Sequence, residues 1–171
     1  MSYRITRFVI STLMTCCLIS PSLALSEPQN APVFSLPGQD KTIDLSKYRG
    51  KVVYLDFWAS WCDPCKRSFP WMNKLQEQYG RDGLEIIAVN LDSSRQDAEE
   101  FLTKVPATFD IAFDEKGKTA EIYKLKAMPS SYLIDRNGKL VHKSLGYRKE
   151  EKEIIESKIQ QLTTNNLIAK R

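Results

Sequence analysis

The chain has 171 residues, of which 42% are apolar, so it is large enough for one domain with an ordinary core and requires no second one. Its formal charge of +4 falls to +2 without residues 1–26, which contain two arginines and no acidic residue. This near balance excludes the strongly basic surface that binds nucleic acid, so we expect no nucleic-acid partner.

Residues 1–26 have the layout of a secretory signal peptide. They begin with two arginines, continue with the apolar run 8–19 and end with a proline among small residues. Cleavage fits after either Ala24 or Ser26. The alternative is an uncleaved anchor, although the apolar stretch is barely long enough to cross a bilayer. We therefore expect an exported protein with a single domain over residues 27–171, attached to a membrane only if the leader is retained.

The cysteine count narrows the chemistry. Cys16 and Cys17 lie within the predicted leader, so Cys62 and Cys65 are the only cysteines of the domain, and His142 is the only histidine. A structural zinc ion usually takes four Cys or His ligands, so we expect no metal site within one chain. In an oxidising compartment the two remaining cysteines are expected to pair with each other. The histidine is interpreted as a surface or packing residue rather than a catalyst.

The first part of the domain leads to a strand and a helix that flank the cysteines. Residues 27–40 are rich in proline and polar residues, which favours an extended entry segment, and residues 33–36 and 42–45 are predicted to pair as a short hairpin. The apolar run 52–58 predicts a strand buried on both faces. Apolar residues at three- and four-residue steps predict a helix over 64–79.

The second part alternates strands and helices before it ends in a hairpin and a helix. Strands are predicted at 84–90, 109–113, 130–134 and 139–145, and helices at 95–104, 119–123 and 148–162. An Asn-Gly pair marks the turn between the last two strands. In the last helix, the residues expected to face the core are Ile154, Ile155, Ile159 and Leu162. This order predicts an α/β fold whose central mixed sheet has helices on both faces.

The two cysteines are three residues apart at the predicted start of a helix. Pro64 restricts the backbone between Cys62 and Cys65, and a disulfide that closes so short a ring stabilises less than one that joins distant segments. A disulfide that contributes so little to stability is better explained as one that opens and closes during a reaction. The helix N-terminus favours the thiolate of Cys62, which is therefore the expected nucleophile, and Cys65 is the expected resolving thiol. This mechanism requires an accessible sulfur at Cys62.

Asp63 influences the direction of electron flow. A carboxylate beside the nucleophile raises the pKa of the Cys62 thiol by repulsion, and Lys66 offsets part of this effect. A less stable thiolate makes the pair a stronger reductant, with about 30 mV corresponding to about 1.4 kcal/mol. The sequence therefore favours reduction of other disulfides over donation of one.

Two segments carry a resemblance to a known family. The segment 56–66 (DFWASWCDPCK), followed by Pro70, resembles the thioredoxin signature, and the segment 128–138 (MPSSYLIDRNG) is similar to the strand entry that carries a cis-proline in that fold. The leader, the N-terminal hairpin and the extra strand and helix within 98–123 resemble the TlpA/ResA-type exported thiol-disulfide reductases. The resemblance covers about residues 30–163 and implies a thioredoxin-like fold, with a β-α insertion before the cis-proline strand, in the bacterial periplasm.

The resemblance also implies residue roles. Pro129 would be cis and would lie against the cysteine pair, where it presents the Met128 backbone to a substrate strand and keeps metals away from the thiols. Asp56 would be the buried acid that moves a proton to or from the resolving thiol, although many TlpA/ResA-type chains have asparagine at this position. From the residues alone, Asp56 is either a buried carboxyl with a raised pKa or a hydrated group at a sheet edge, and Met128-Pro129 is an ordinary turn.

Further substrate contacts are expected around the pair. An exposed Trp61 would offer a flat apolar surface to a substrate, with simple packing as the alternative, whereas Trp58 is expected in the core. Asp63, Pro64 and Met128 complete the predicted substrate-binding residues.

Together these observations predict a thiol-disulfide oxidoreductase of the cell envelope that reduces disulfides in exported proteins through its Cys-Asp-Pro-Cys site. We expect a monomer without a cofactor, kept reduced by an upstream membrane or periplasmic electron donor. Three clients stay open: apocytochrome c during cytochrome c biogenesis, a copper-site assembly factor, or misoxidised proteins in general. The alternative functions are a disulfide-donating oxidase or isomerase, a peroxidase, and a non-enzymatic binding module with a permanent disulfide.

Overall fold

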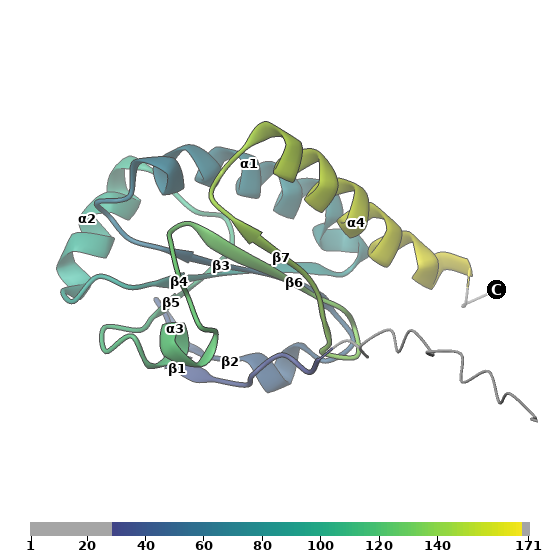
Figure 1. Ribbon diagram of the computed structural model, residues 1–171, viewed down its shortest axis with the longest axis horizontal. Helices are drawn as coiled ribbons and strands as arrows, with labels where there is room; N and C mark the ends of the chain where they lie inside the picture. The colour runs from purple at the N-terminus through teal and green to yellow at the C-terminus, as the bar shows by residue number, and fades with distance from the viewer. Residues whose placement is uncertain (1–28, 169–171) are drawn as a thin grey trace, which may run out of the picture.

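A five-stranded mixed sheet forms the centre of the protein in a computed structural model that describes residues 29–168 (Figure 1). The predicted leader, residues 1–26, lies outside the described part. The strand order is β5-β4-β3-β6-β7, in which β3, β4 and β5 are parallel and β6 and β7 are antiparallel to their neighbours. The strands are β3 (Val52–Trp58), β4 (Leu84–Asn90), β5 (Asp110–Phe113), β6 (Ser130–Ile134) and β7 (Leu140–Leu145). The predicted α/β architecture is confirmed.

Strand β3 occupies the middle of this sheet. It pairs with β4 on one side and β6 on the other, and all seven of its residues are buried. A run of apolar and β-branched residues forms such a strand because both of its faces contact other layers. The alternative that Asp56 lies at a sheet edge is therefore wrong.

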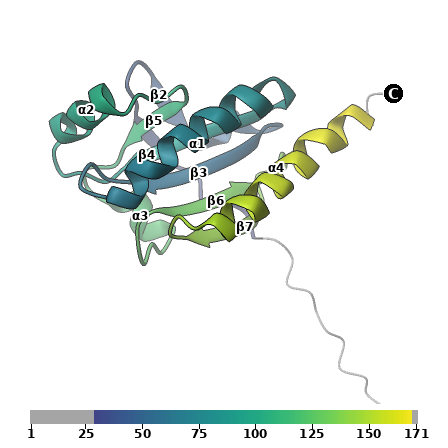
Figure 2. The ribbon, with the colours of Figure 1, turned by 90° about the horizontal axis from the view of Figure 1, so that it is seen from above.

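Helices cover both faces of the sheet, three on one and one on the other (Figures 1 and 2). Helices α1 (Asp63–Tyr79), α2 (Arg95–Lys104) and α4 (Lys149–Ile168) lie on the first face, with the short 3₁₀ helix Gly80–Asp82 after α1. The second face carries α3 (Lys118–Ile122), the 3₁₀ helix Leu45–Tyr48 and a separate hairpin of β1 (Ser35–Pro37) and β2 (Thr42–Asp44). Among the described residues no helix is both long and apolar enough to cross a membrane.

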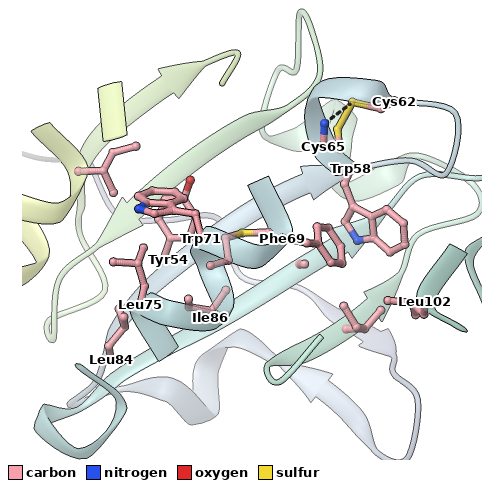
Figure 3. Packing of buried hydrophobic residues seen from close by; sticks show 14 of the residues in the cluster. Tyr54, Trp58, Cys62, Cys65, Phe69, Trp71, Leu75, Leu84, Ile86 and Leu102 are labelled. Carbon is pink, nitrogen blue, oxygen red and sulfur yellow. Dashed lines mark hydrogen bonds between the residues drawn. A yellow bond between two sulfur atoms is a disulfide. The ribbon is translucent and has the colours of Figure 1, made fainter. Parts of the chain in front are cut away.

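Each face of the sheet has its own apolar core. On the first face the β3 rings of Tyr54 and Trp58 pack among residues of α1 and α4 such as Phe69 and Ile159, and both cysteines belong to the same cluster (Figure 3). On the second face Val53, Leu55 and Phe57 of β3 belong to a cluster with residues of the hairpin and of the end of α3. Because side chains alternate along a strand, β3 contributes to both cores.

The last helix differs from its prediction in one inward residue. Ile155 and Ile159 are buried as expected, but Ile154 is 43% exposed. The buried stripe continues instead at Thr163, which is 1% exposed, so it follows positions four residues apart. Ile154 lies one residue outside this stripe, which turns its side chain towards solvent.

Candidate active site

The two cysteines form a disulfide at the start of α1. Strand β3 ends at Trp58, and a short turn leads to Cys62, which is the N-cap residue of α1. The Cys62–Cys65 Cα atoms are 5.3 Å apart, and the Cys65 backbone N–H donates a hydrogen bond to Cys62 Sγ at 3.3 Å (Figure 3). One backbone N–H at the helix N-terminus, that of Cys65, is thus directed at the first sulfur, where it would stabilise a thiolate in the reduced protein.

The two cysteines are more buried than the predicted mechanism requires. Cys62 is 4% exposed and Cys65 is 0% exposed. Both residues belong to the apolar cluster above the sheet, so the expectation of an accessible Cys62 is wrong for this disulfide-bonded form. Because Cys65 has no exposure, Cys62 is the one residue of the pair with any contact with solvent.

The Met128–Pro129 peptide bond is cis. Pro129 is buried and immediately precedes β6, where Ser130 pairs with Phe57 of β3. This register places the proline at the end of β3 from which the chain continues to Cys62. The cis-proline and the cysteine pair therefore share one end of the central sheet.

Asp56 is buried within the apolar core of the first face. It is 1% exposed and lies between Tyr54 and Trp58 on the sheet face that α1 and the cysteines cover. Its Oδ2 atom has no hydrogen-bond partner among the described residues. Burial raises the pKa of the Asp56 carboxyl well above its usual range. A carboxyl with a raised pKa can donate a proton when it is neutral and accept one when it is ionised.

An apolar groove lies beside the cysteine pair. Trp61 is 70% exposed, the largest exposure of any large apolar side chain among residues 29–164. With Met128 it lines a groove of about 350 Å³, which is completed mainly by Leu91, Leu125 and Lys126. The structure thus brings Trp61 and Met128 together, as expected for substrate contacts. Leu125 and Lys126 were not predicted from the sequence as part of this site, although their position just before the cis-proline was a usable signal.

The remaining predicted contacts face elsewhere. Asp63 is exposed in the first turn of α1 and lines a second, polar groove of about 320 Å³ with Ser60, Lys66 and residues of α2. Pro64 is half-buried beside it at the helix start. The structure therefore separates Asp63 from the apolar groove and does not join it to Trp61 and Met128.

Two polar residues near the site were missed by the sequence analysis. Asp92, which is 3% exposed, accepts hydrogen bonds from the backbone N–H of Ser60 at 2.9 Å and from the Ser60 hydroxyl at 3.1 Å. A usable signal was present, because Asp92 follows one buried strand, Ser60 follows another, and parallel strands bring their carboxyl ends to the same edge.

Nothing in the described range forms an evident metal site. Residues 29–168 contain no group of three or more Cys, His, Asp or Glu side chains placed to hold a metal ion. His142 lies half-buried on β7, where its ring nitrogen is 3.4 Å from a Glu151 carboxylate oxygen.

Comparison with known proteins agrees with this geometry. Residues 28–143 match the AhpC/TSA family. The chain is 36% identical over 137 residues to the thiol-disulfide oxidoreductase ResA of Bacillus cereus. The aligned region covers 80% of this chain and 77% of that protein.

Two solved structures extend the comparison. The chain is 49% identical to a thiol:disulfide interchange protein DsbE from Chlorobium tepidum, with a TM-score of 0.78 over 82% of this chain and 99% of that one. It is 32% identical to the exposed lipoprotein thioredoxin Etrx1 of Streptococcus pneumoniae, with a TM-score of 0.67 over 77% and 100% of the two chains. With its Cys62–Cys65 disulfide at a helix start, the protein belongs to the AhpC/TSA family, and it is a thioredoxin-fold thiol-disulfide oxidoreductase.

Proposed function

We propose that this oxidoreductase works as an exported disulfide reductase of the cell envelope, with other exported proteins as its clients. The observation that carries the proposal is the asymmetry of the cysteine pair. Cys62 Sγ accepts a hydrogen bond from the backbone at the N-terminus of α1, and Cys62 is 4% exposed, whereas Cys65 is 0% exposed. One sulfur is therefore placed to meet a client, and the other to react only with the first.

The reaction is a two-electron exchange. In the reduced protein the Cys62 thiolate attacks one sulfur of the client disulfide, so that the client S–S bond breaks, a Cys62–client bond forms and the second client sulfur leaves as a thiolate. Cys65 then loses its proton to Asp56, which acts as a base in its ionised form, and attacks Cys62 Sγ, so that the Cys62–client bond breaks and the first client sulfur leaves; Asp56 afterwards gives up the proton. The protein ends with the Cys62–Cys65 disulfide, and the client holds two thiols once its sulfurs are protonated. An external electron donor restores the dithiol.

The groove beside the pair supports contact with an unfolded or extended client segment. Trp61 offers an apolar face, and Met128, which precedes the cis-proline, lines the same groove. The clients that the sequence leaves open are apocytochrome c, a copper-site assembly factor and misoxidised proteins in general, each of which would be a substrate in its disulfide form. We expect a monomer to suffice for this reaction.

Reduction is favoured over oxidation because Asp63 lies next to the nucleophile. A strong oxidant needs a very stable thiolate, which an adjacent carboxylate opposes. A reduction potential near the oxidising extreme, about −120 mV, would instead indicate a disulfide-donating oxidase. Consumption of hydrogen peroxide by the reduced protein would indicate a peroxidase.

Export to the periplasm is supported by the leader pattern of residues 1–26. Fusion of this segment to a reporter that is active only outside the cytoplasm tests export. Mass spectrometry of the exported chain then distinguishes cleavage after Ala24 or Ser26 from a retained anchor.

Trapping is the decisive test of the mechanism. The full-length Cys65→Ala variant, expressed in the cell envelope, is expected to accumulate mixed disulfides with clients because no resolving thiol remains. Non-reducing electrophoresis would show these mixed disulfides, and mass spectrometry would identify the trapped client and the cysteine that holds it. The matched control, Cys62→Ser with Cys65 intact, is expected to trap nothing. Equal trapping by the two variants, or none by either, would contradict the assigned roles.

A further inference from the structure

A buried carboxylate fastens the turn that precedes Cys62. Asp92 lies just past the end of β4, and its two carboxylate oxygens accept three hydrogen bonds from two residues. Oδ2 accepts from the Ser60 backbone N–H at 2.9 Å and from the Asn90 side-chain amide at 2.7 Å, while Oδ1 accepts from the Ser60 hydroxyl at 3.1 Å. All three contacts use the carboxylate as an acceptor, and the residue is 3% exposed.

The turn held by this carboxylate sets the position of the nucleophile. Its residues run from Ala59 to Cys62, and the Cys62 backbone N–H donates to the Ala59 carbonyl at 3.1 Å. At the neighbouring level, the Leu91 backbone N–H donates to the Trp58 carbonyl at 2.9 Å, so the segment after β4 is bound to the segment after β3 at two successive points. Ser60 is thus clamped in the middle of the chain that joins β3 to the helix.

Two observations connect this clamp to the reactive sulfur rather than to general stability. Cys62 is the N-cap of α1, and its sulfur receives the Cys65 N–H only while the turn keeps it in line with the helix axis. The next residue along the turn from Ser60 is Trp61, whose exposed ring lines the apolar groove together with Leu91, the neighbour of Asp92. The hydrogen bonds between Asp92 and Ser60 are therefore close along the chain to the nucleophile and to two residues of the groove.

We propose that Asp92 is a positioning residue of the thiol-disulfide exchange, which acts through Ser60 to hold Cys62 at the N-terminus of α1. The inference rests on the proposed role of Cys62 as nucleophile. Asp92 does not touch the reacting sulfurs. It holds the turn so that the helix N–H groups meet the thiolate, and misplacement of a reacting group by as little as about 1 Å lowers rates substantially.

The pair of variants Asp92→Asn and Asp92→Ala separates geometry from charge. Neither variant carries the carboxylate charge. Asparagine preserves the clamp, because its oxygen accepts from the Ser60 and Asn90 N–H groups while its amide donates to the Ser60 hydroxyl, which can also act as an acceptor. Alanine removes all three hydrogen bonds. Any difference between the two variants therefore reports positioning.

The readouts follow the Cys62 thiol directly. In the reduced full-length protein, the pH dependence of alkylation by iodoacetamide gives the Cys62 thiol pKa, and the rate of reaction with oxidised glutathione gives its reactivity. We expect Asp92→Ala to react with oxidised glutathione about tenfold more slowly than Asp92→Asn and to have the higher thiol pKa. Circular dichroism establishes that both variants are folded.

Asp114 provides a matched control. It is also a buried acid, at the end of β5, and its carboxylate accepts three backbone N–H groups at the start of α3, those of Lys118, Thr119 and Ala120. Asp114→Ala and Asp114→Asn are expected to differ in stability but to share one thiol pKa and one rate with oxidised glutathione. A purely structural role for Asp92 would produce this same result at position 92.

Equal rates and equal thiol pKa values in the two Asp92 variants would overturn the proposal. If Asp92→Ala does not fold, the Ser60→Ala variant replaces it, because this variant loses only the hydroxyl contact with Asp92. A rate of reaction with oxidised glutathione about two- to threefold below that of wild type would support the proposal. An unchanged rate and an unchanged Cys62 thiol pKa would refute it. The proposed function fails separately, when wild-type protein does not react with oxidised glutathione through Cys62.

Discussion

The carboxyl of Asp56 is buried, and its Oδ2 has no hydrogen-bond partner among the described residues. Native proteins seldom retain such a group unless it serves the chemistry, because burying an unpaired polar atom is unfavourable. The proposed proton exchange with Cys65 would give Asp56 such a function, because Cys65 itself is 0% exposed.

The raised pKa of Asp56 predicts a dependence of stability on pH. The folded protein binds this proton more tightly than the unfolded chain, in which the carboxyl has its ordinary pKa of 3.8. The stabilisation is therefore complete below pH 3.8 and is lost as pH rises towards the folded pKa. Asp56→Asn removes this loss, so the variant should gain stability relative to wild type as pH rises, by at least about 1 kcal/mol at the alkaline end.

Urea unfolding of the oxidised proteins between about pH 5 and about pH 9 measures this gain. The exposed Asp40→Asn substitution is the control and should run parallel to wild type. A constant difference between wild type and Asp56→Asn across the range would show that Asp56 does not titrate as its burial requires.

Trp61 predicts a separation between protein clients and small disulfides. Its ring contributes to the groove but is not needed to activate the sulfur, so Trp61→Ala should raise KM for a protein client about tenfold and leave the reaction with oxidised glutathione within about twofold of wild type. Steady-state kinetics with both substrates measure the effect. Val33→Ala removes another exposed apolar side chain away from this groove and should change neither value. Equal losses with both substrates would place Trp61 in the chemistry instead.

At the scale of elements, α4 closes the apolar core on the sheet face that carries the active site. Ile155 and Ile159 face β3 and α1 within one cluster, whereas Ile154 is on the outer side of the helix. The helix contributes to stability through one stripe of side chains four residues apart.

Two isoleucines of α4, one buried and one exposed, therefore have different expected effects on stability. Ile159→Ala opens a cavity in the core and should lower the free energy of unfolding by about 2–5 kcal/mol. Ile154→Ala removes the same number of methyl and methylene groups from a partly exposed site and should cost under about 1 kcal/mol. Urea unfolding of the oxidised variants measures both. Comparable losses at the two positions would mean that α4 packs in another rotation.

At the scale of the whole molecule, folding and redox potential are linked. A disulfide that is stabilised by the folded state is harder to reduce, so a reductase should be more stable in its oxidised form than in its reduced form. For this protein we expect urea unfolding to occur at a higher midpoint with the Cys62–Cys65 bridge intact than with both thiols free. A more stable reduced form would indicate an oxidant and would reverse the proposed direction of electron flow.

The strands show which parts of the fold could be predicted. The bounds of β3, β4 and β6 coincide with those of the predicted strands 52–58, 84–90 and 130–134. The first two are largely apolar runs, for which local composition is sufficient because both of their faces are buried, and the third was predicted from the Asn-Gly turn that follows it. The inward residues of α4 were less certain because one exposed face of a helix tolerates an isoleucine, and only packing determines its rotation.

By itself the sequence determined the chemistry: two cysteines three residues apart after a buried strand, with a helix behind them and a proline before the last pair of strands. These are local features, since spacing and composition alone decide whether two thiols can bridge. Only the tertiary structure decided that Asp92 clamps Ser60, that Asp63 faces away from the Trp61 groove, and that Cys65 is sealed. Each of these depends on contacts between segments far apart in the chain, and such contacts arise only when the sheet brings its strand ends together.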